Sequence, residues 1–138
     1  MNAPSFNSDE GRDHAEPRVA EWLSKAADDL GVAKTLLATG DVRAFDAVCF
    51  HCQQGAEKLL KAVLEARGLD VPKVHDLVNL HGRVSNCLPG WQFSAVRLSD
   101  LSSMAVETRY PGFRAARADA KVAFETASEL WESLRPLV

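Results

Sequence analysis

Apolar residues recur at three- and four-residue steps along most of the chain, and polar residues fill the positions between them. This spacing is typical of amphipathic helices, whereas the alternation and tight turns of paired strands are scarce. The pattern predicts helices over residues 17–39, 42–67, 75–84, 93–109 and 113–134. We therefore predict an all-α fold, an antiparallel up-down helix bundle of four long helices plus one short helix, with short connections.

Two segments of different character divide the chain. Residues 1–16 are polar and acidic, and we expect them to form a flexible N-terminal tail, which also lacks the apolar centre of a signal peptide. Residues 17–138 carry the helical pattern and form the predicted bundle domain. A chain of 138 residues with 46% hydrophobic residues fits one domain with a sizeable core.

Charge and cysteine content narrow the functional class. A formal net charge of −3 gives no general attraction to nucleic acid or to a membrane surface, so any basic binding site must be local. No apolar run approaches the roughly 18 residues of a membrane span, and we expect no membrane contact. The three cysteines are odd in number, which indicates reduced thiols and a cytoplasmic protein.

The helix predicted over residues 42–67 has a polar line opposite its apolar stripe. Its members are His51, Gln54, Lys58 and Lys61. Amides can read base edges, ammonium groups bind phosphate, and the ring of the bordering Phe50 can stack on a base. A solvated face has the same pattern, and Phe50 also favours contact with a second copy of this helix. These three interpretations stay open.

Arg109 and Tyr110 stand at the end of the helix predicted over residues 93–109, directly before a proline. Arg109 falls on the apolar side of that helix, so its guanidinium needs a partner or a cleft. It caps helix carbonyls, pairs with Glu107 or Asp119, or binds a phosphate. The sequence leaves these alternatives open.

The sequence gives little support for a metal site or for a catalytic site. Zinc needs about four converging ligands, but Cys49 and Cys52 face the apolar side of their helix while His51 faces away. Buried free thiols are therefore expected, and His75 with Asp76 is interpreted as the start of a helix. We predict no metal, no cofactor and no catalytic residue.

Three segments resemble the signatures of HEPN domains. Residues 50–62, FHCQQGAEKLLKA, resemble the string FHxQQAAEKxLKA, except that Gly55 replaces an alanine and would allow close helix approach. Residues 73–80, KVHDLVNL, resemble the segment K-x-HDL-x-x-L that follows it. Residues 108–112, TRYPG, resemble the RYP turn before the last helix.

The resemblance implies a bundle that commonly forms a homodimer, binds a nucleotide or RNA, and pairs with a small nucleotidyltransferase, in some cases as a toxin–antitoxin pair. Some HEPN proteins are metal-independent ribonucleases with an arginine and a histidine four to six residues apart. No histidine follows Arg109 or any other arginine at that spacing here. RNA cleavage would therefore lack its general acid or base.

Three functions remain in competition. The leading one is a non-catalytic module that dimerises and binds a nucleotide, RNA or a nucleotidyltransferase partner. Its expected ligand-binding residues are His51, Gln54, Lys58, Lys61, Arg109 and Tyr110. The second is a ribonuclease in which His51 or His75 meets Arg109 across a cleft. The third is a structural adaptor or antitoxin-like subunit with Phe50 and Trp91 as contact residues.

Overall fold

The computed structural model describes residues 4–7 and 17–138. Its elements are α1 (Pro17–Thr39), the 3-10 helix η2 (Val42–Ala44), α2 (Phe45–Ala66), α3 (Leu77–Cys87), α4 (Ala95–Glu107), α5 (Arg117–Leu134) and the 3-10 helix η3 (Arg135–Leu137). The described residues contain no strand, so the predicted all-α bundle is confirmed. No helix among them is long and apolar enough to cross a membrane.

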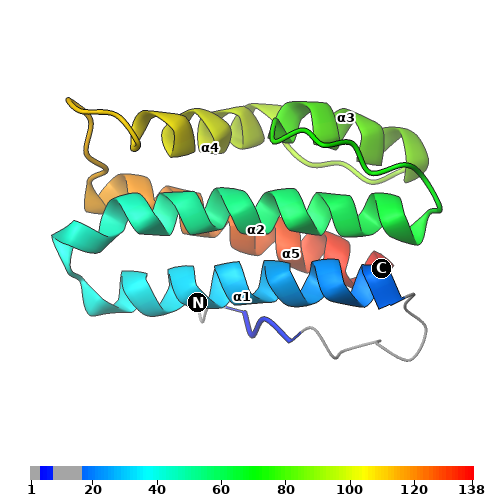
Figure 1. Ribbon diagram of the computed structural model, residues 1–138, viewed down its shortest axis with the longest axis horizontal. Coiled ribbons are helices and arrows are strands. Elements are labelled where there is room, and N and C mark those ends of the chain that lie inside the picture. The colour runs from blue at the N-terminus through cyan, green and yellow to red at the C-terminus, as the bar shows by residue number, and fades with distance from the viewer. Residues whose placement is uncertain (1–3, 8–16) are drawn as a thin grey trace.

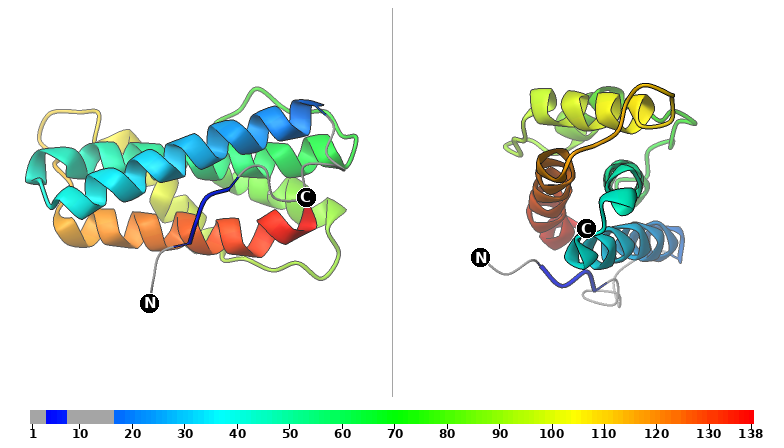
Figure 2. Two further views of the ribbon diagram at one scale, coloured as in Figure 1. Left: turned by 90° about the horizontal axis from the view of Figure 1, so that it is seen from below. Right: turned by 90° about the vertical axis from the view of Figure 1, so that its left-hand side faces the viewer.

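The bundle has four rows of helix, formed by α1, by α2, by α3 and α4 together (the α3–α4 arm), and by α5. α1 and α2 run antiparallel, and α4 and α5 do the same (Figure 1). α3 and α4 lie end to end along one side of α2, and together they extend along most of its length (Figures 1 and 2). The lengths of 11 and 13 residues for α3 and α4 correct the expectation that only one helix is short.

Polar side chains set the helix starts that differ from the predicted ones. Asp76 accepts a hydrogen bond from the backbone N–H of Val78 at 2.9 Å, so α3 begins after it. The last helix begins at Arg117, four residues later than predicted. Its approach is held by Asp46 of α2, which accepts from the backbone N–H of Ala115 at 2.7 Å.

Gly55 lets α1 and α2 approach closely. A Cβ atom at this position would lie 2.6 Å from Cδ2 and 2.7 Å from Cγ of Leu30, which is fully buried in α1. An alanine therefore does not fit without movement of Leu30 or of the helix. The close contact expected for Gly55 is confirmed, and it brings the polar residues of α1 against those of α2.

Residues 4–7 differ from the expected flexible tail. The ring of Phe6 packs edge-on against Trp131, with 5.5 Å between centroids, and against Phe124, with 6.1 Å. Phe6 therefore adds to the core from outside the predicted domain boundary. The rest of the predicted tail, residues 1–3 and 8–16, lies outside the described residues.

Candidate functional site

One face of α2 is covered by no other helix that the structure describes. α2 lies between α1 and the α3–α4 arm with α5 behind it, and the end-on view shows no helix on the side away from α5 (Figures 1 and 2). His51, Gln54 and Lys58 are half-buried there, and Phe50 is 37% exposed. We call these four residues the α2 face.

Asp29 of α1 neutralises part of the α2 face. Its Oδ1 lies 2.9 Å from Nδ1 of His51, and its Oδ2 accepts from Nζ of Lys58 at 2.5 Å. The carboxylate is mostly buried, so the Lys58 charge is matched inside the protein. The Nδ1 contact leaves Nε2 of His51 as the ring nitrogen available to a ligand.

The structure corrects the prediction for Lys61, which is buried and does not extend the exposed polar line. It is only 5% exposed, and its Nζ donates to Oε2 of Glu57 at 3.0 Å. Its ammonium lies over the ring of Trp22 from α1, 5.7 Å from the centroid. The physical reason is that a buried ammonium must be paired, and Glu57 and Trp22 provide the partners.

Glu57 is also bound from the connection between α2 and α3. Nδ1 of His75 lies 3.1 Å from its Oε1, while the backbone carbonyl of His75 accepts from Nε2 of Gln53 at 3.0 Å. Nε2 of Gln54 in turn donates to Oε1 of Gln53 at 2.8 Å. The amide of Gln54, which we expected to face a ligand, is thus held by Gln53, and Gln53 is held by the connection.

Arg109 lies in the turn after α4 and not inside the predicted helix. Its guanidinium carbon sits 5.6 Å from the ring centroid of Phe50, so the α2 face and this turn are in contact. Neither Glu107 nor Asp119 forms an ion pair with it in the described part of the chain; Asp119 instead accepts from the backbone N–H of Ala116 at 2.8 Å. Of the alternatives for Arg109, pairing with these two carboxylates is excluded.

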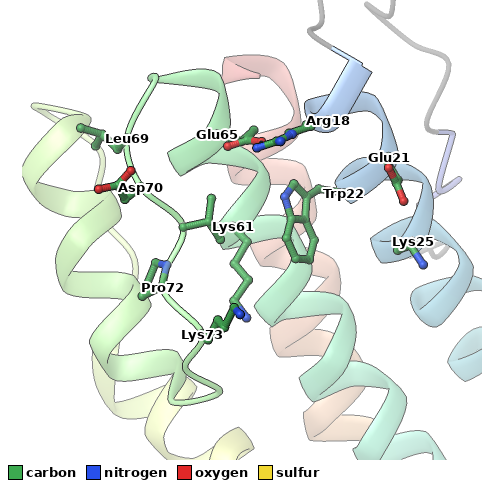
Figure 3. Close-up of a pocket in the computed structure, with 11 residues that line it drawn as sticks. Arg18, Glu21, Trp22, Lys25, Lys61, Glu65, Leu69, Asp70, Pro72 and Lys73 are labelled. Atoms are coloured by element: carbon green, nitrogen blue, oxygen red, sulfur yellow. The ribbon is translucent and has the colours of Figure 1, made fainter.

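Two hollows open at the borders of the α2 face. The Arg109 cleft has a volume of about 500 Å³ and is lined by Gln53, His75, Asp76, Ser102, Ser103, Ala105, Val106, Glu107 and Arg109. The Trp22 pocket has a volume of about 690 Å³ and is lined by Arg18, Glu21, Trp22, Lys25, Lys61, Glu65 and residues 69–73 (Figure 3). Both volumes are in the range of small-molecule sites.

The remaining predicted contact residues lie apart from each other. Tyr110 is 63% exposed beside Arg109. Trp91 is half-buried, stacks on Phe93, and donates from Nε1 to Oγ of Ser133 at 2.6 Å, so it ties the α3–α4 connection to α5. Tyr110 follows Arg109, which contacts Phe50 of the α2 face, whereas Trp91 contacts Phe93 and Ser133.

Two of the three cysteines lie in the core below the α2 face. Cys49 and Cys52 are fully buried, and burial raises the pKa of both thiols, that of Cys49 to about 12. No group of three or more histidine, cysteine, aspartate or glutamate side chains within residues 4–7 and 17–138 could hold a metal ion.

Three residues of the site were not among the predicted ones: Asp29, Glu57 and Trp22. The Glu57–Lys61 pair had a local signal, because residues four apart on a helix are neighbours. Asp29 and Trp22 belong to another helix, and only the pairing of α1 with α2 brings them to Lys58 and Lys61. No spacing within one segment indicates such contacts.

Comparisons with known proteins agree with this architecture. The family model described as "HEPN domain" matches residues 19–137. The crystal structure of TT1696 from Thermus thermophilus is similar, with a TM-score of 0.73 and 22% sequence identity, covering 89% of this chain and 100% of that one. At this identity the similarity shows the fold alone. No curated protein matches the sequence significantly.

Proposed function

Since the chain belongs to the HEPN domain family, we propose that it is a non-catalytic module that binds a nucleotide or RNA along the α2 face. The observation that supports this is a pair of ring–cation contacts that border the face. Arg109 lies over Phe50 on one side, and Lys61 lies over Trp22 on the other. Single-stranded nucleic acid is bound by aromatic rings that stack on bases and by cations that contact phosphates, and Arg109 forms no ion pair among the described residues that would compete for its charge.

The spacing of the two contacts fits a short ligand. Phe50 and Lys61 are eleven positions apart on α2, which corresponds to roughly 16 Å along a helix that rises 1.5 Å per residue. The charge available between them is small, because Lys58 and Lys61 already have carboxylate partners. We therefore expect few phosphate contacts and a shallow dependence of affinity on salt concentration.

Binding of labelled six-nucleotide RNA and of free nucleotides tests this proposal. Arg109→Ala should weaken binding about tenfold, the loss of one charge-assisted contact. Arg83→Ala is the matched control, because this exposed α3 residue donates to Asn79 on its own helix and lines neither hollow. The proposal fails if no RNA or nucleotide binds at millimolar concentration, or if the two variants bind equally.

We also propose that the module forms a homodimer and pairs with a small nucleotidyltransferase, as the family resemblance implies. Exposed apolar side chains beside the Arg109 cleft support a protein contact there. Val106 is 51% exposed and Tyr110 63% exposed. Phe50 contacts Arg109, which precedes Tyr110 in the chain and lines the cleft together with Val106.

A ribonuclease is the second candidate, and one observation favours it. His75 and Arg109 line the same cleft, and Glu57 holds Nδ1 of His75, which leaves Nε2 for proton transfer. Arg109→Ala and His75→Ala should then each reduce RNA cleavage at least a hundredfold. His81→Ala is the control, because its Nε2 donates to the carbonyl of Phe93 outside the cleft. Absent or unchanged cleavage in all four proteins dismisses this candidate.

A further inference from the structure

The Trp22 pocket is built from three segments that are distant in the sequence. α1 contributes Trp22 and Lys25, α2 contributes Lys61, and the connection after α2 contributes residues 69–73 (Figure 3). Its volume of about 690 Å³ exceeds that of the Arg109 cleft. None of the residues predicted from the sequence as ligand-binding lies in it except Lys61.

Its apolar surfaces suit a flat ring. Trp22 projects from α1, and Pro72 lies on the opposite side of Lys61 in the close-up view, with Leu69 and Val71 also lining the pocket (Figure 3). Trp22 is partly buried, so its indole is held in place by packing. Trp22, over whose ring the Lys61 ammonium lies 5.7 Å from the centroid, lines the same pocket as these aliphatic side chains, and an aromatic ring can pack against such a surface and exclude water.

Two ammonium groups of the pocket remain for an anion. Lys61 is paired with buried Glu57, and Arg18 lies 3.8 Å from Glu65. Lys25 and Lys73, in contrast, form no ion pair with any of the described residues. The pocket can therefore take a ligand of small negative charge.

Two carboxylates limit that charge. Glu21 and Asp70 also line the pocket, and neither forms an ion pair within residues 4–7 and 17–138. Like charges repel most strongly at short range, so each additional negative charge on the ligand would weaken binding.

We infer that the Trp22 pocket binds a nucleotide that carries one phosphate, with the base on Trp22 and the phosphate at Lys73, next to Lys61. This inference rests on the proposed function and places the phosphate-bearing end of the nucleotide or RNA in the Trp22 pocket. A free nucleoside monophosphate and the 5′-phosphorylated end of an RNA share this chemistry. A triphosphate should bind less well, because its additional charge meets Glu21 and Asp70.

Calorimetric titration with AMP in the presence of EDTA tests the inference. Lys73→Ala should weaken AMP binding about tenfold. Lys121→Ala should change nothing, because this exposed lysine belongs to α5, which lies behind α2 (Figure 1). Trp22→Phe should retain binding and Trp22→Leu should lose it, with circular dichroism showing that both variants are folded. ATP should bind more weakly than AMP.

Two further measurements distinguish a free nucleotide from an RNA end as the ligand, and distinguish failure of this inference from failure of the proposed function. A hexameric RNA with a 5′-phosphate that outcompetes its unphosphorylated form identifies the RNA end as ligand, and equal competition identifies the free nucleotide. If AMP binding is lost in Arg109→Ala but kept in Lys73→Ala, the pocket inference is overturned and the proposed function survives. If neither AMP nor RNA binds the wild-type protein, both are overturned. Tighter binding of ATP than of AMP overturns the charge argument and with it the inference.

Discussion

At the scale of single residues, two carboxylates determine how much positive charge the site presents. Asp29 binds both His51 and Lys58, and Glu57 binds Lys61. A count of cations along α2 therefore overstates the attraction for phosphate. The cations left for a ligand are Arg109 at one border and Lys25 and Lys73 of the Trp22 pocket at the other.

The thiols give a prediction at the same scale. Burial raises the pKa of Cys49 to about 12 and raises that of Cys52 as well, so neither is a thiolate at pH 8. Because the thiolate is the nucleophile, only the half-buried Cys87 should react rapidly with Ellman's reagent in the native protein. All three cysteines should react after unfolding in urea. Three equal rates in the native state would contradict this.

The raised pKa values also give the sign of a pH dependence. In the unfolded chain a thiol ionises near a pKa of about 8.5, whereas folded Cys49 keeps its proton up to about 12. The stability gained from this is complete below a pH of about 8.5 and decreases as the pH rises toward the folded pKa. Urea denaturation at pH 8 and pH 10 should show the decrease, and a Cys49→Ala and Cys52→Ala double variant should show less of it.

At the scale of elements, the α1–α2 contact depends on Gly55. Gly55→Ala would gain up to about 1 kcal/mol of helix propensity but would overpack Leu30 at a cost of about 1–3 kcal/mol. We expect a net loss of about 1 kcal/mol in the free energy of unfolding, measured by urea denaturation. Adding Leu30→Val should recover part of the loss in a double-mutant cycle.

Gly31 in α1 is the matched control for this substitution. A Cβ atom there meets no heavy atom within 4 Å, so Gly31→Ala should stabilise the protein by up to about 1 kcal/mol. If both alanine variants change stability in the same direction, close packing at Gly55 does not control the α1–α2 contact.

Local patterns predicted the elements better than they predicted the contacts of the site. The helical stripe located α1 at residues 17–39, because propensity and burial along one helix agree. The predicted start of α5 was wrong because Asp46, almost seventy residues earlier in the chain, accepts a hydrogen bond from Ala115 and holds the segment before the helix. The predicted exposure of Lys61 was wrong for the same kind of reason. Trp22 of α1 and the α2–α3 connection cover a position that would be exposed on an isolated helix.

At the scale of the whole molecule, the exposed apolar side chains predict self-association. Light scattering should show a dimer, and Val106→Asp, in the lining of the Arg109 cleft, should shift it toward monomer. Val32→Asp on α1 is the control, because this valine is 42% exposed and lines neither hollow. A wild-type monomer at high micromolar concentration, or identical behaviour of both variants, would refute the proposed homodimer.

Glu57 links the Arg109 cleft to the Trp22 pocket. The same carboxylate is bonded to His75, which lines the Arg109 cleft, and to Lys61, which lines the Trp22 pocket. A ligand that draws the Lys61 ammonium toward itself changes the hydrogen bonding that orients His75. If each hollow binds a ligand as proposed, occupancy of one would change the affinity of the other, and thermodynamic linkage requires the factor to be the same in both directions. A buried ion pair of α2 would thus give this small helix bundle binding cooperativity within one subunit.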